Sequence, residues 1–307
     1  MEDTHNMNPA LDQLKIYLAG KIVDARDARV SVFDAGFQSG DAVWEGLRLY
    51  NGTVFSIDEH LSRLEESAKA LCLRLPLDKS GIRDAVYQTL EANNFTDGAH
   101  LRLMVTRGTR STSGMDPKNA PDVGTLIIIA ESKPVDDQPA PQRLRTSSIR
   151  RPSAATLDPS IHHSNQLNSI LARLEVRNDP GVDAALMLDM DGNVAEADTA
   201  NIFLVKGNSV YTPYATACLS GLTRRLVLKL AADAGFDSQE RTLGLFDFYG
   251  ADEVFITGTV CELVPIVAID GRPIGLGEPG PVHQALLRAY RGYINDASAA
   301  NRQEDVA

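Results

Sequence analysis

The chain has 307 residues, of which 43% are hydrophobic and 23% charged, and it carries a formal net charge of −11 at pH 7. This length allows two compact domains, each with its own core. An acidic chain without a Lys/Arg-rich run is a poor partner for nucleic acid or an anionic membrane, so we expect a small-molecule substrate.

The cysteine spacing and the N-terminal stretch indicate the cellular compartment in which the protein is expected. Cys72, Cys218 and Cys261 show no C-x-x-C spacing, which argues against a disulfide framework or a zinc knuckle and fits a reducing environment. The stretch MEDTHNMNPALDQ is polar and acidic, unlike a signal peptide, and no apolar run approaches the length of a membrane span. We therefore expect a cytoplasmic protein.

The first half predicts hairpins, a helix and buried strands. Short β-prone runs flank Ala19-Gly20 and Asn51-Gly52, so residues 14–25 and 48–56 are expected to form hairpins. Apolar residues recur at helical spacing over 56–73, where Ser56 followed by Glu59 fits a capping box. The apolar runs at 101–108 and 124–132 predict strands.

The second half alternates between helices and strands, which together with the first half predicts an α+β fold. Helices are expected at 165–178, 220–235 and 281–294, and strands at 184–189, 201–212 and 253–258. The segment SKPVDDQPAPQ resists both helix and sheet pairing. It predicts an N-terminal α+β domain over 1–131, a linker over 132–142 and a C-terminal domain over 143–307.

Four features could bind a ligand, although each also has a purely structural interpretation. In SGLTRRL, Gly221 and Thr223 open a helix whose free N–H groups favour an anion, but they could simply cap it. The stretch TGTVCE, residues 257–262, could be only a turn. Glu196 in VAEADTAN could be a surface acid, and Arg63 could be a solvated arginine of its helix.

The order of five motifs is more specific than any one of them. Along the chain, the motifs occur in the order GFQSGDAVWEGLR, HLSRLEESA, VAEADTANIFLV, LSGLTR and ADEVFITGTVCELVPI. This order resembles the fold-type IV pyridoxal-phosphate (PLP) enzymes, which include branched-chain and D-amino-acid aminotransferases and aminodeoxychorismate lyases. The resemblance covers nearly the whole chain. It implies a two-domain fold, a cofactor cleft between the halves and a homodimer.

The resemblance also implies roles for individual residues. Arg63 matches the arginine that binds the cofactor phosphate, and Glu196 matches the carboxylate that pairs with the pyridine nitrogen. Asn201 matches an asparagine expected to orient that region. The phosphate contacts are completed by Leu222, Thr223 and Thr259, and the backbone of Val260 and Cys261 falls where the family receives the substrate carboxylate.

The stretch PSIHHSNQL departs from the family at its central position. Transamination normally uses a lysine three or four residues before an asparagine, yet His162 stands three residues before Asn165. An imidazole can move protons at neutral pH but offers no primary amine. Lys133, Lys206 and Lys229 do not restore the pattern.

Three interpretations of this departure stay open. His162 could move the proton for PLP, or for pyridoxamine phosphate, held by noncovalent contacts alone. The pocket could instead serve other chemistry, or binding without catalysis. The alignment could also have misplaced the lysine, or the position could have been changed artificially.

The two adjacent histidines do not predict a metal site. Neighbouring residues of an extended segment face opposite sides, so His162 and His163 could not easily bind one ion. The remaining histidines are isolated in the sequence. We expect no metal, and we expect His163 to face solvent or to support the site from behind.

Departures elsewhere bear on the substrate. D-amino-acid aminotransferases carry an Arg-x-His pair where this chain has Thr112 and Gly114, although Arg110 could compensate from nearby. WEGLR, with Glu45 and Arg48, looks more like the branched-chain group. The expected activity is that of an aminotransferase on a small, apolar amino acid or 2-oxo acid. An aminodeoxychorismate-type lyase remains an alternative, and it too would lack its lysine.

Overall fold

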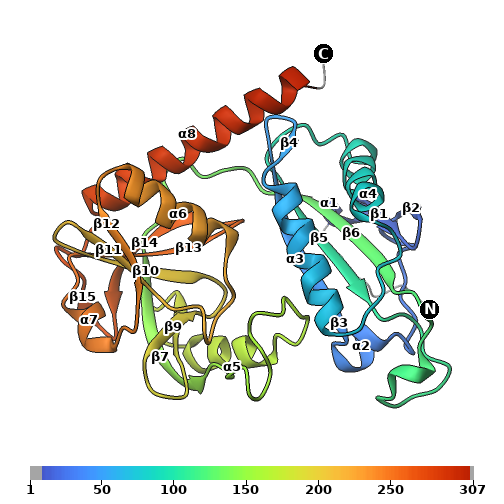
Figure 1. Cartoon of the computed structure of the whole chain (residues 1–307), viewed down its shortest axis with the longest axis horizontal. Helices are drawn as coiled ribbons and strands as arrows, with labels where there is room; N and C mark the ends of the chain where they lie inside the picture. Colours follow the sequence, from blue (N-terminus) through green and yellow to red (C-terminus); the bar gives the residue numbers. More distant parts are fainter. Residues whose placement is uncertain (1–8, 305–307) are drawn as a thin grey trace. The chain divides into compact units, whose positions relative to one another are not determined.

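The computed structural model describes residues 9–304 and the side chains of residues 11–299. The chain divides into two compact units, each built around its own β-sheet (Figure 1). Unit 1 comprises Met1–Val135, His162–Asn165 and Ala297–Ala307, and unit 2 comprises Asp136–Ile161 and Gln166–Asp296. The fold is therefore mixed α+β with two sheets, as the sequence predicted.

Unit 1 holds a six-stranded antiparallel sheet in the order β2-β1-β6-β5-β3-β4. Both predicted hairpins are confirmed, because Leu18 pairs with Lys21 and Tyr50 pairs with Thr53. Asn51 and Gly52 both have positive φ, which is the conformation that a two-residue turn requires. The strands are β1 (Lys15–Leu18), β2 (Lys21–Asp24), β3 (Ala42–Tyr50), β4 (Thr53–Val54), β5 (Ala99–Thr106) and β6 (Thr125–Ser132).

Two long helices cover one face of this sheet (Figure 1). Helix α3 (Ile57–Ala70) packs against β3, and α4 (Lys79–Ala92), which the sequence analysis missed, packs against β1, β6 and α3. The predicted capping box at α3 is wrong, because Ser56 has a left-handed backbone and its side chain makes no cap bond. The shorter helices are α1 (Pro9–Asp12), α2 (Ala35–Ser39) and the 3₁₀ turn η1 (Pro117–Asn119).

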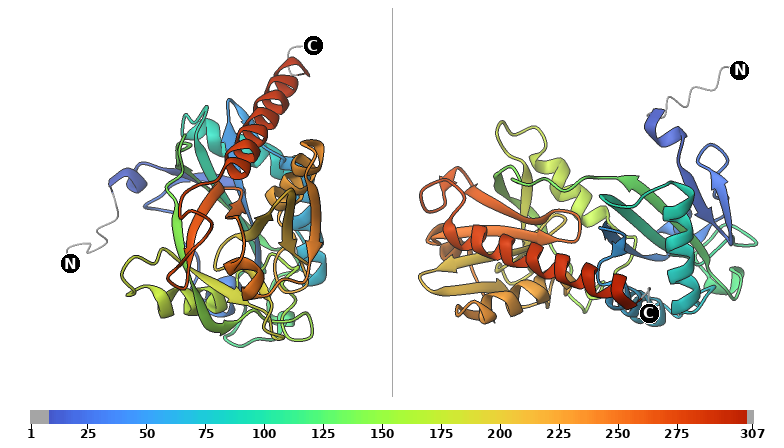
Figure 2. Two further views of the ribbon diagram at one scale, coloured as in Figure 1. Left: turned by 90° about the vertical axis from the view of Figure 1, so that its left-hand side faces the viewer. Right: turned by 90° about the horizontal axis from the view of Figure 1, so that it is seen from above.

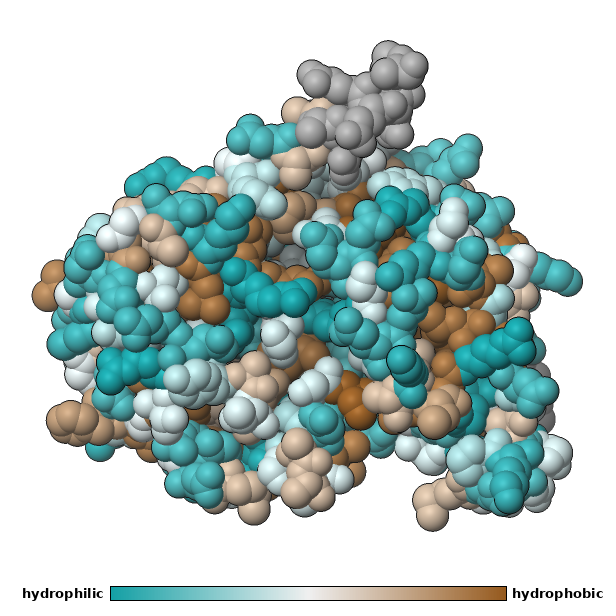
Figure 3. Space-filling view, viewed as in Figure 1, coloured by the Kyte–Doolittle hydropathy of each residue, from teal (hydrophilic) through white to brown (hydrophobic). Residues whose placement is uncertain are grey.

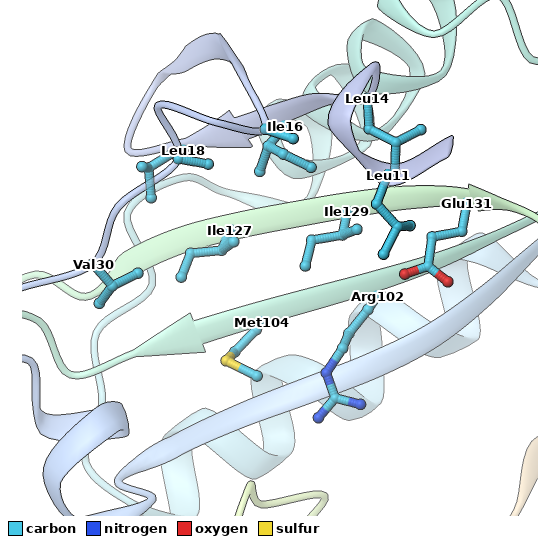
Figure 4. A pocket seen from close by; sticks show the side chains of 12 residues that line it. Leu11, Leu14, Ile16, Leu18, Val30, Arg102, Met104, Ile127, Ile129 and Glu131 are labelled. Atoms are coloured by element: carbon cyan, nitrogen blue, oxygen red, sulfur yellow. The ribbon is translucent and has the colours of Figure 1, made fainter. Parts of the chain in front are cut away.

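The opposite face of the unit 1 sheet is hollowed. Side chains alternate between the two faces of a strand, so Leu103 and Ile128 point toward the helices while Arg102 and Ile129 point away. A hollow of about 360 Å³ lies on this second face. Figure 4 shows apolar side chains of β1, β5 and β6 lining it, with Arg102 and Glu131 at one end.

Unit 2 holds a nine-stranded sheet in the order β12-β11-β10-β13-β14-β7-β8-β9, with β15 paired to β14. Its predicted strands and helices are confirmed, whereas strands β7, β9, β12, β14 and β15 and helix α7 (Leu245–Tyr249) were not predicted. The strands are β7 (Gln142–Arg150), β8 (Ala184–Leu188), β9 (Val194–Ala197), β10 (Asn201–Lys206), β11 (Ser209–Pro213), β12 (Asp237–Arg241), β13 (Glu253–Gly258), β14 (Glu262–Ile269) and β15 (Arg272–Pro273).

The helices of unit 2 pack against different strands of its sheet. Helix α5 (Leu167–Val176) packs against β7 and β8, and α6 (Leu222–Asp233) packs against β12 and β13, as Figures 1 and 2 show. The other two helices are α7 (Leu245–Tyr249) and α8 (Pro281–Glu304). The largest apolar cluster of this unit centres on buried residues of β8, β10, α7 and β13, namely Leu186, Ile202, Phe248 and Ile256.

The surface is of mixed polarity. On the face drawn in Figure 3, hydrophobic residues lie in separate patches between hydrophilic ones. Within the part of the chain that the structure describes, no helix combines the length and the apolar character needed to cross a bilayer.

Candidate functional site

In unit 2, a short connection brings Glu196 and Asn201 together. Strand β9 ends at Ala197 and β10 begins at Asn201, with the Ala197 N–H bonded to the carbonyl of Ala200 at 2.9 Å. The Asn201 amide Nδ2 donates to Glu196 Oε2 at 3.4 Å and to the carbonyl of Leu219 at 2.9 Å. Asn201 thereby links the carboxylate to the chain that leads into α6.

The start of α6 offers unpaired backbone donors. Its N-cap residue is Gly221, which has no side chain to cap the helix. A Cβ at this position would overlap Asn201 Oδ1, so the close approach requires glycine. The N–H groups of Leu222 and Thr223, together with the helix dipole, therefore favour an anion at this end. Both residues lie where the sequence predicted an anion site.

The end of β13 lies beside the same asparagine. Asn201 and Thr257 are register partners, and Gly258 pairs with Glu262 across a three-residue turn formed by Thr259, Val260 and Cys261. The Thr257 hydroxyl is buried and has no hydrogen-bond partner in the structure. Three segments distant in the sequence thus meet around Asn201, and two of them carry predicted phosphate or substrate contacts.

Arg151 belongs to this group although the sequence analysis did not select it. Its Nε lies 2.9 Å from Glu196 Oε1 and 3.3 Å from the carbonyl of Ala217. Its Nη1 donates to Asn168 at 2.9 Å. The residue follows β7 directly, and no local pattern distinguishes it from neighbouring arginines. Arg151 comes close to Glu196 only because β7 pairs with β8 and β8 pairs with β9.

Both acids of the VAEADTAN motif are buried. The interpretation of Glu196 as a surface acid is wrong, since its exposed fraction is 8%. Asp198 is 4% exposed, and its Oδ2 lies 2.6 Å from Arg173 Nε. Burial raises the pKa of Glu196 to about 7, with Asp198 adding to the increase and Arg151 opposing it. Burial likewise raises the pKa of the nearby Cys218 thiol to about 12. Cys218 is therefore not a thiolate at neutral pH.

The raised pKa of Glu196 predicts a pH-dependent stability. The carboxyl ordinarily titrates near 4.5 and in the fold near 7, so its favourable contribution is complete below pH 4.5 and is lost as the pH rises through 7. The loss is on the order of 3 kcal/mol. Urea unfolding of the wild type and of Glu196→Gln at several pH values should show this fall in the wild type alone. Parallel pH curves for both proteins would contradict the prediction.

In unit 1, four hydrogen bonds converge on the buried carboxylate of Glu45. Arg63 donates Nε to Oε1 at 2.8 Å and Nη2 to Oε2 at 2.7 Å. The Nδ1 atom of His60 lies 2.7 Å from Oε2, and that of His162 lies 3.0 Å from Oε1. Burial alone would raise the pKa of Glu45, but His162, Arg63 and His60 together hold it well below its usual value.

The backbone of His162 is fixed to β3 and α3. Its N–H donates to Ser67 Oγ at 3.1 Å, and its carbonyl accepts from the Trp44 N–H at 3.0 Å. The imidazole lies against the Trp44 ring with centroids 4.2 Å apart. Residues 162–165 therefore belong to unit 1, alongside β3.

His163 is not a solvent-facing ring. Its exposed fraction is 9%, and its Nδ1 accepts the N–H of Asn165 at 3.2 Å. The antiparallel bridge between Val43 and His163 explains this burial, because it holds the segment against β3. His163 thus supports the backbone of the motif.

The structure places the two other predicted arginines apart from Glu45. Arg48 follows Glu45 by three residues and so points to the opposite face of β3, where its Nη2 donates to the Lys133 carbonyl at 2.9 Å. Arg110 donates to the Gly114 carbonyl at 2.6 Å and to Asp41 at 3.3 Å. Both side chains are engaged in contacts within unit 1.

No lysine belongs to the group around Asn201 or to the group around Glu45. All eight lie in the part of the chain whose side chains are described, and none is buried. Several of them bind surface acids, hydroxyls or carbonyls, and one lies over a tyrosine ring. The lysines are Lys15, Lys21, Lys69, Lys79, Lys118, Lys133, Lys206 and Lys229.

The sequence contained a usable signal for part of the Glu45 group. His60 and Arg63 are three residues apart on one helix and so share a face. HLSRL therefore already paired a histidine with the arginine, and WEGLR supplied a carboxylate. Their meeting depends on the packing of α3 against β3, which no local pattern indicates.

Comparison with known proteins identifies the family. The family model described as amino-transferase class IV matches residues 42–269. Branched-chain-amino-acid aminotransferase-like protein 2 of Arabidopsis thaliana is 46% identical over 92% of this chain, which spans only 51% of that relative. A putative branched-chain-amino-acid aminotransferase of Methanocaldococcus jannaschii is 42% identical over 91% of this chain and 96% of its own length.

A solved structure agrees with these relatives. The T.th. branched-chain amino acid aminotransferase, complexed with N-(5'-phosphopyridoxyl)-L-glutamate, matches with a TM-score of 0.87 and 30% identity. The match covers 92% of this chain and 95% of that one. The same enzyme is also known with pyridoxamine 5'-phosphate. The chain therefore belongs to the class IV aminotransferase family of fold-type IV pyridoxal-phosphate proteins.

Proposed function

We propose that the protein is a PLP-dependent aminotransferase for a small, apolar amino acid and its 2-oxo acid, with His162 in place of the usual lysine. The observation that carries the proposal is the group around Asn201, which combines a buried carboxylate with an uncapped helix N-terminus. When bound there, PLP would supply the electron sink that stabilises the negative charge left at Cα. The protein's residues would hold the cofactor and move the proton.

The residues of unit 2 fit such a cofactor. Glu196, whose pKa is near 7, would ionise opposite a protonated pyridine nitrogen, because an adjacent positive charge favours the carboxylate. The N–H groups of Leu222 and Thr223 would receive the phosphate. The unpartnered Thr257 hydroxyl and the nearby Thr259 turn offer further donors. These features match the two charged ends of the cofactor.

The residues of unit 1 fit a phosphate but not a covalent bond to the cofactor. Arg63 is held in a defined orientation by two bonds to Glu45, as a phosphate-binding arginine should be. His162 offers no amine, and no lysine is buried. We therefore propose that PLP or pyridoxamine phosphate is held noncovalently.

Substrate class follows from the relatives and from the engaged arginines. The T.th. relative is known complexed with 4-methylvaleric acid, a branched apolar acid. Since Arg48 and Arg110 already donate to groups of unit 1, we assign the substrate carboxylate to the backbone of Val260 and Cys261. Their turn position beside Asn201 supports this assignment.

A second candidate function is binding without catalysis. The observation that favours it is that every lysine is at least partly exposed, so none is positioned like a buried, cofactor-bound amine. Such a protein would bind PLP, a related vitamer or another phosphate ligand through the group around Asn201. It would not convert an amino acid.

The visible spectrum of the purified protein separates these functions. Added PLP is expected to bind, to remain removable after borohydride treatment, and to convert to its pyridoxamine form when leucine or valine is supplied. A borohydride-stable bond to the protein would contradict the assignment of His162. Binding without conversion would identify the second function, and no binding would contradict both.

Substitution of His162 tests its position directly. His162→Ala should slow the conversion by about 10²–10⁴-fold, the usual contribution of a general acid–base group. His162→Lys should create a borohydride-stable bond to PLP, whereas the matched control His163→Lys should not. Unchanged conversion in His162→Ala would show that this residue does not carry the proton.

We also propose a homodimer that uses the exposed face of α5. Leu167, Ile170, Leu171 and Leu174 recur at helical spacing and are 64%, 51%, 43% and 46% exposed. An unpartnered apolar stripe of this kind is typical of a protein–protein interface. The double variant Ile170→Asp/Leu174→Asp should sediment as a monomer, while Leu276→Asp, at an isolated and 91% exposed leucine, should sediment like the wild type. A monomeric wild type would contradict the proposal.

A further inference from the structure

We infer that Glu45 is the positioning residue for His162: it fixes the imidazole in the tautomer whose Nδ1 carries the proton and whose Nε2 is the proton acceptor. This inference rests on the proposed function only in assigning Nε2 a catalytic task. The tautomer itself follows from the contacts of Glu45.

The carboxylate of Glu45 is saturated with donors. An ionised carboxylate only accepts hydrogen bonds and has about four lone-pair positions. Arg63 occupies one position on each oxygen, His60 a second on Oε2 and His162 a second on Oε1. Arginine can only donate. Both histidines must therefore donate from Nδ1 as well, since Glu45 has no proton to offer them.

Burial of the ring keeps Nε2 free of a proton. The groups facing His162 are Glu45 from β3 and His60 and Arg63 from α3. Burial lowers the pKa of His162 below 6.5, and Arg63 and His60 lower it further, against the opposing effect of Glu45. At neutral pH the ring is therefore uncharged. With its single proton on Nδ1, its remaining nitrogen is a base.

The ring is also restricted in position. Its backbone is bonded to Ser67 and Trp44, its Nδ1 to Glu45, and its face lies against the Trp44 ring. A lysine at this position would reach through a four-carbon chain with several rotatable bonds. The direction of Nε2 is instead determined by the Glu45 bond, so the loss of that bond should misdirect the base as well as change its tautomer.

Glu45 links this base to the cofactor-binding arginine. The same Oε1 accepts from Arg63 Nε and from His162 Nδ1. Loss of the carboxylate should thus weaken PLP binding and slow the proton transfer, and the two effects are separable. The affinity for PLP measures the effect on Arg63. The conversion rate at saturating PLP measures the effect on His162.

The first test needs no substitution. Long-range nitrogen–proton spectra of the ¹⁵N-histidine-labelled protein identify which ring nitrogen carries the proton, and the His162 signals are assigned by their absence in His162→Gln. At neutral pH, a protonated Nδ1 and an unprotonated Nε2 are expected. A protonated Nε2, or two protonated nitrogens, would overturn the inference whether or not the protein is an aminotransferase.

The second test uses Glu45→Gln, which keeps the shape but halves the acceptor capacity. The Nε2-protonated tautomer of His162 should appear, and conversion of saturating PLP by the amino acid should slow by about 10²-fold. The control Glu253→Gln alters a buried carboxylate that bonds Val282 and His283 in unit 2 and should retain the wild-type rate.

The outcomes distinguish the two proposals. If His162→Ala slows conversion but Glu45→Gln changes neither rate nor tautomer, Glu45 is not the positioning residue although the proposed function stands. If the tautomer is as inferred but the wild type converts no amino acid, the function fails and the positioning contact stands. A folded Glu45→Gln is not required, because the wild-type spectrum alone decides the tautomer.

Discussion

Glu45→Ala is expected to lower the free energy of unfolding by about 3–5 kcal/mol, the usual effect of breaking a buried ion pair by removing one partner. Glu45 is fully buried and its partner Arg63 is 12% exposed. Without the carboxylate, the guanidinium keeps its charge in a site from which water is largely excluded. The rings of His60 and His162 lose an acceptor in the same step. Urea unfolding followed by circular dichroism measures the change.

An exposed ion pair between α3 and α4 provides the control. Glu65 lies 3.0 Å from Lys79, with side chains 42% and 41% exposed, so Glu65→Ala should change the stability by less than about 1 kcal/mol. Both substitutions remove one glutamate and its ion pair. The difference between their losses in the free energy of unfolding therefore measures the effect of burial. Equal, small losses for the two variants would show that the Glu45 group does not stabilise unit 1.

Glu196→Gln is expected to reduce the rate of amino-group transfer by about 10²–10³-fold, the effect of removing one preorganised electrostatic contact. Glutamine has nearly the same shape as glutamate but cannot balance a positive pyridine nitrogen. The loss should not reflect unfolding, because removal of this buried acid should leave the stability at pH 8 equal or higher. Single-turnover conversion of bound PLP, measured beside urea unfolding, separates the two quantities.

Asp198→Asn provides the matched control for Glu196. Asp198 is also buried and paired with an arginine, Arg173, but it belongs to a different set of contacts. Burial raises the pKa of Asp198 as well, so this substitution should also leave the stability at pH 8 equal or higher, and the rate per folded molecule should stay close to that of the wild type. Similar rate losses in both variants would indicate a general disturbance of β9 rather than a role for Glu196.

Local sequence patterns predicted most of the elements that carry the site. Asn51-Gly52 predicted its hairpin because both residues tolerate positive φ. Gly221 followed by Thr223 predicted the start of α6 because this signal is local, although it left open whether the helix end is capped. Helix α4 was missed, and the capping box at Ser56 failed because the chain turns left-handed there on entering α3.

By itself, then, the sequence determined the α+β class, the family resemblance, the helix that starts after Gly221 and the histidine at position 162. These follow from residue identity and short-range spacing, which the chain carries at every stage of folding. Only the tertiary structure decided that Arg151 faces Glu196 and that Glu45 joins Arg63 to His162. The physical reason is that buried charges need partners, and strand pairing and helix packing bring those partners from distant parts of the chain.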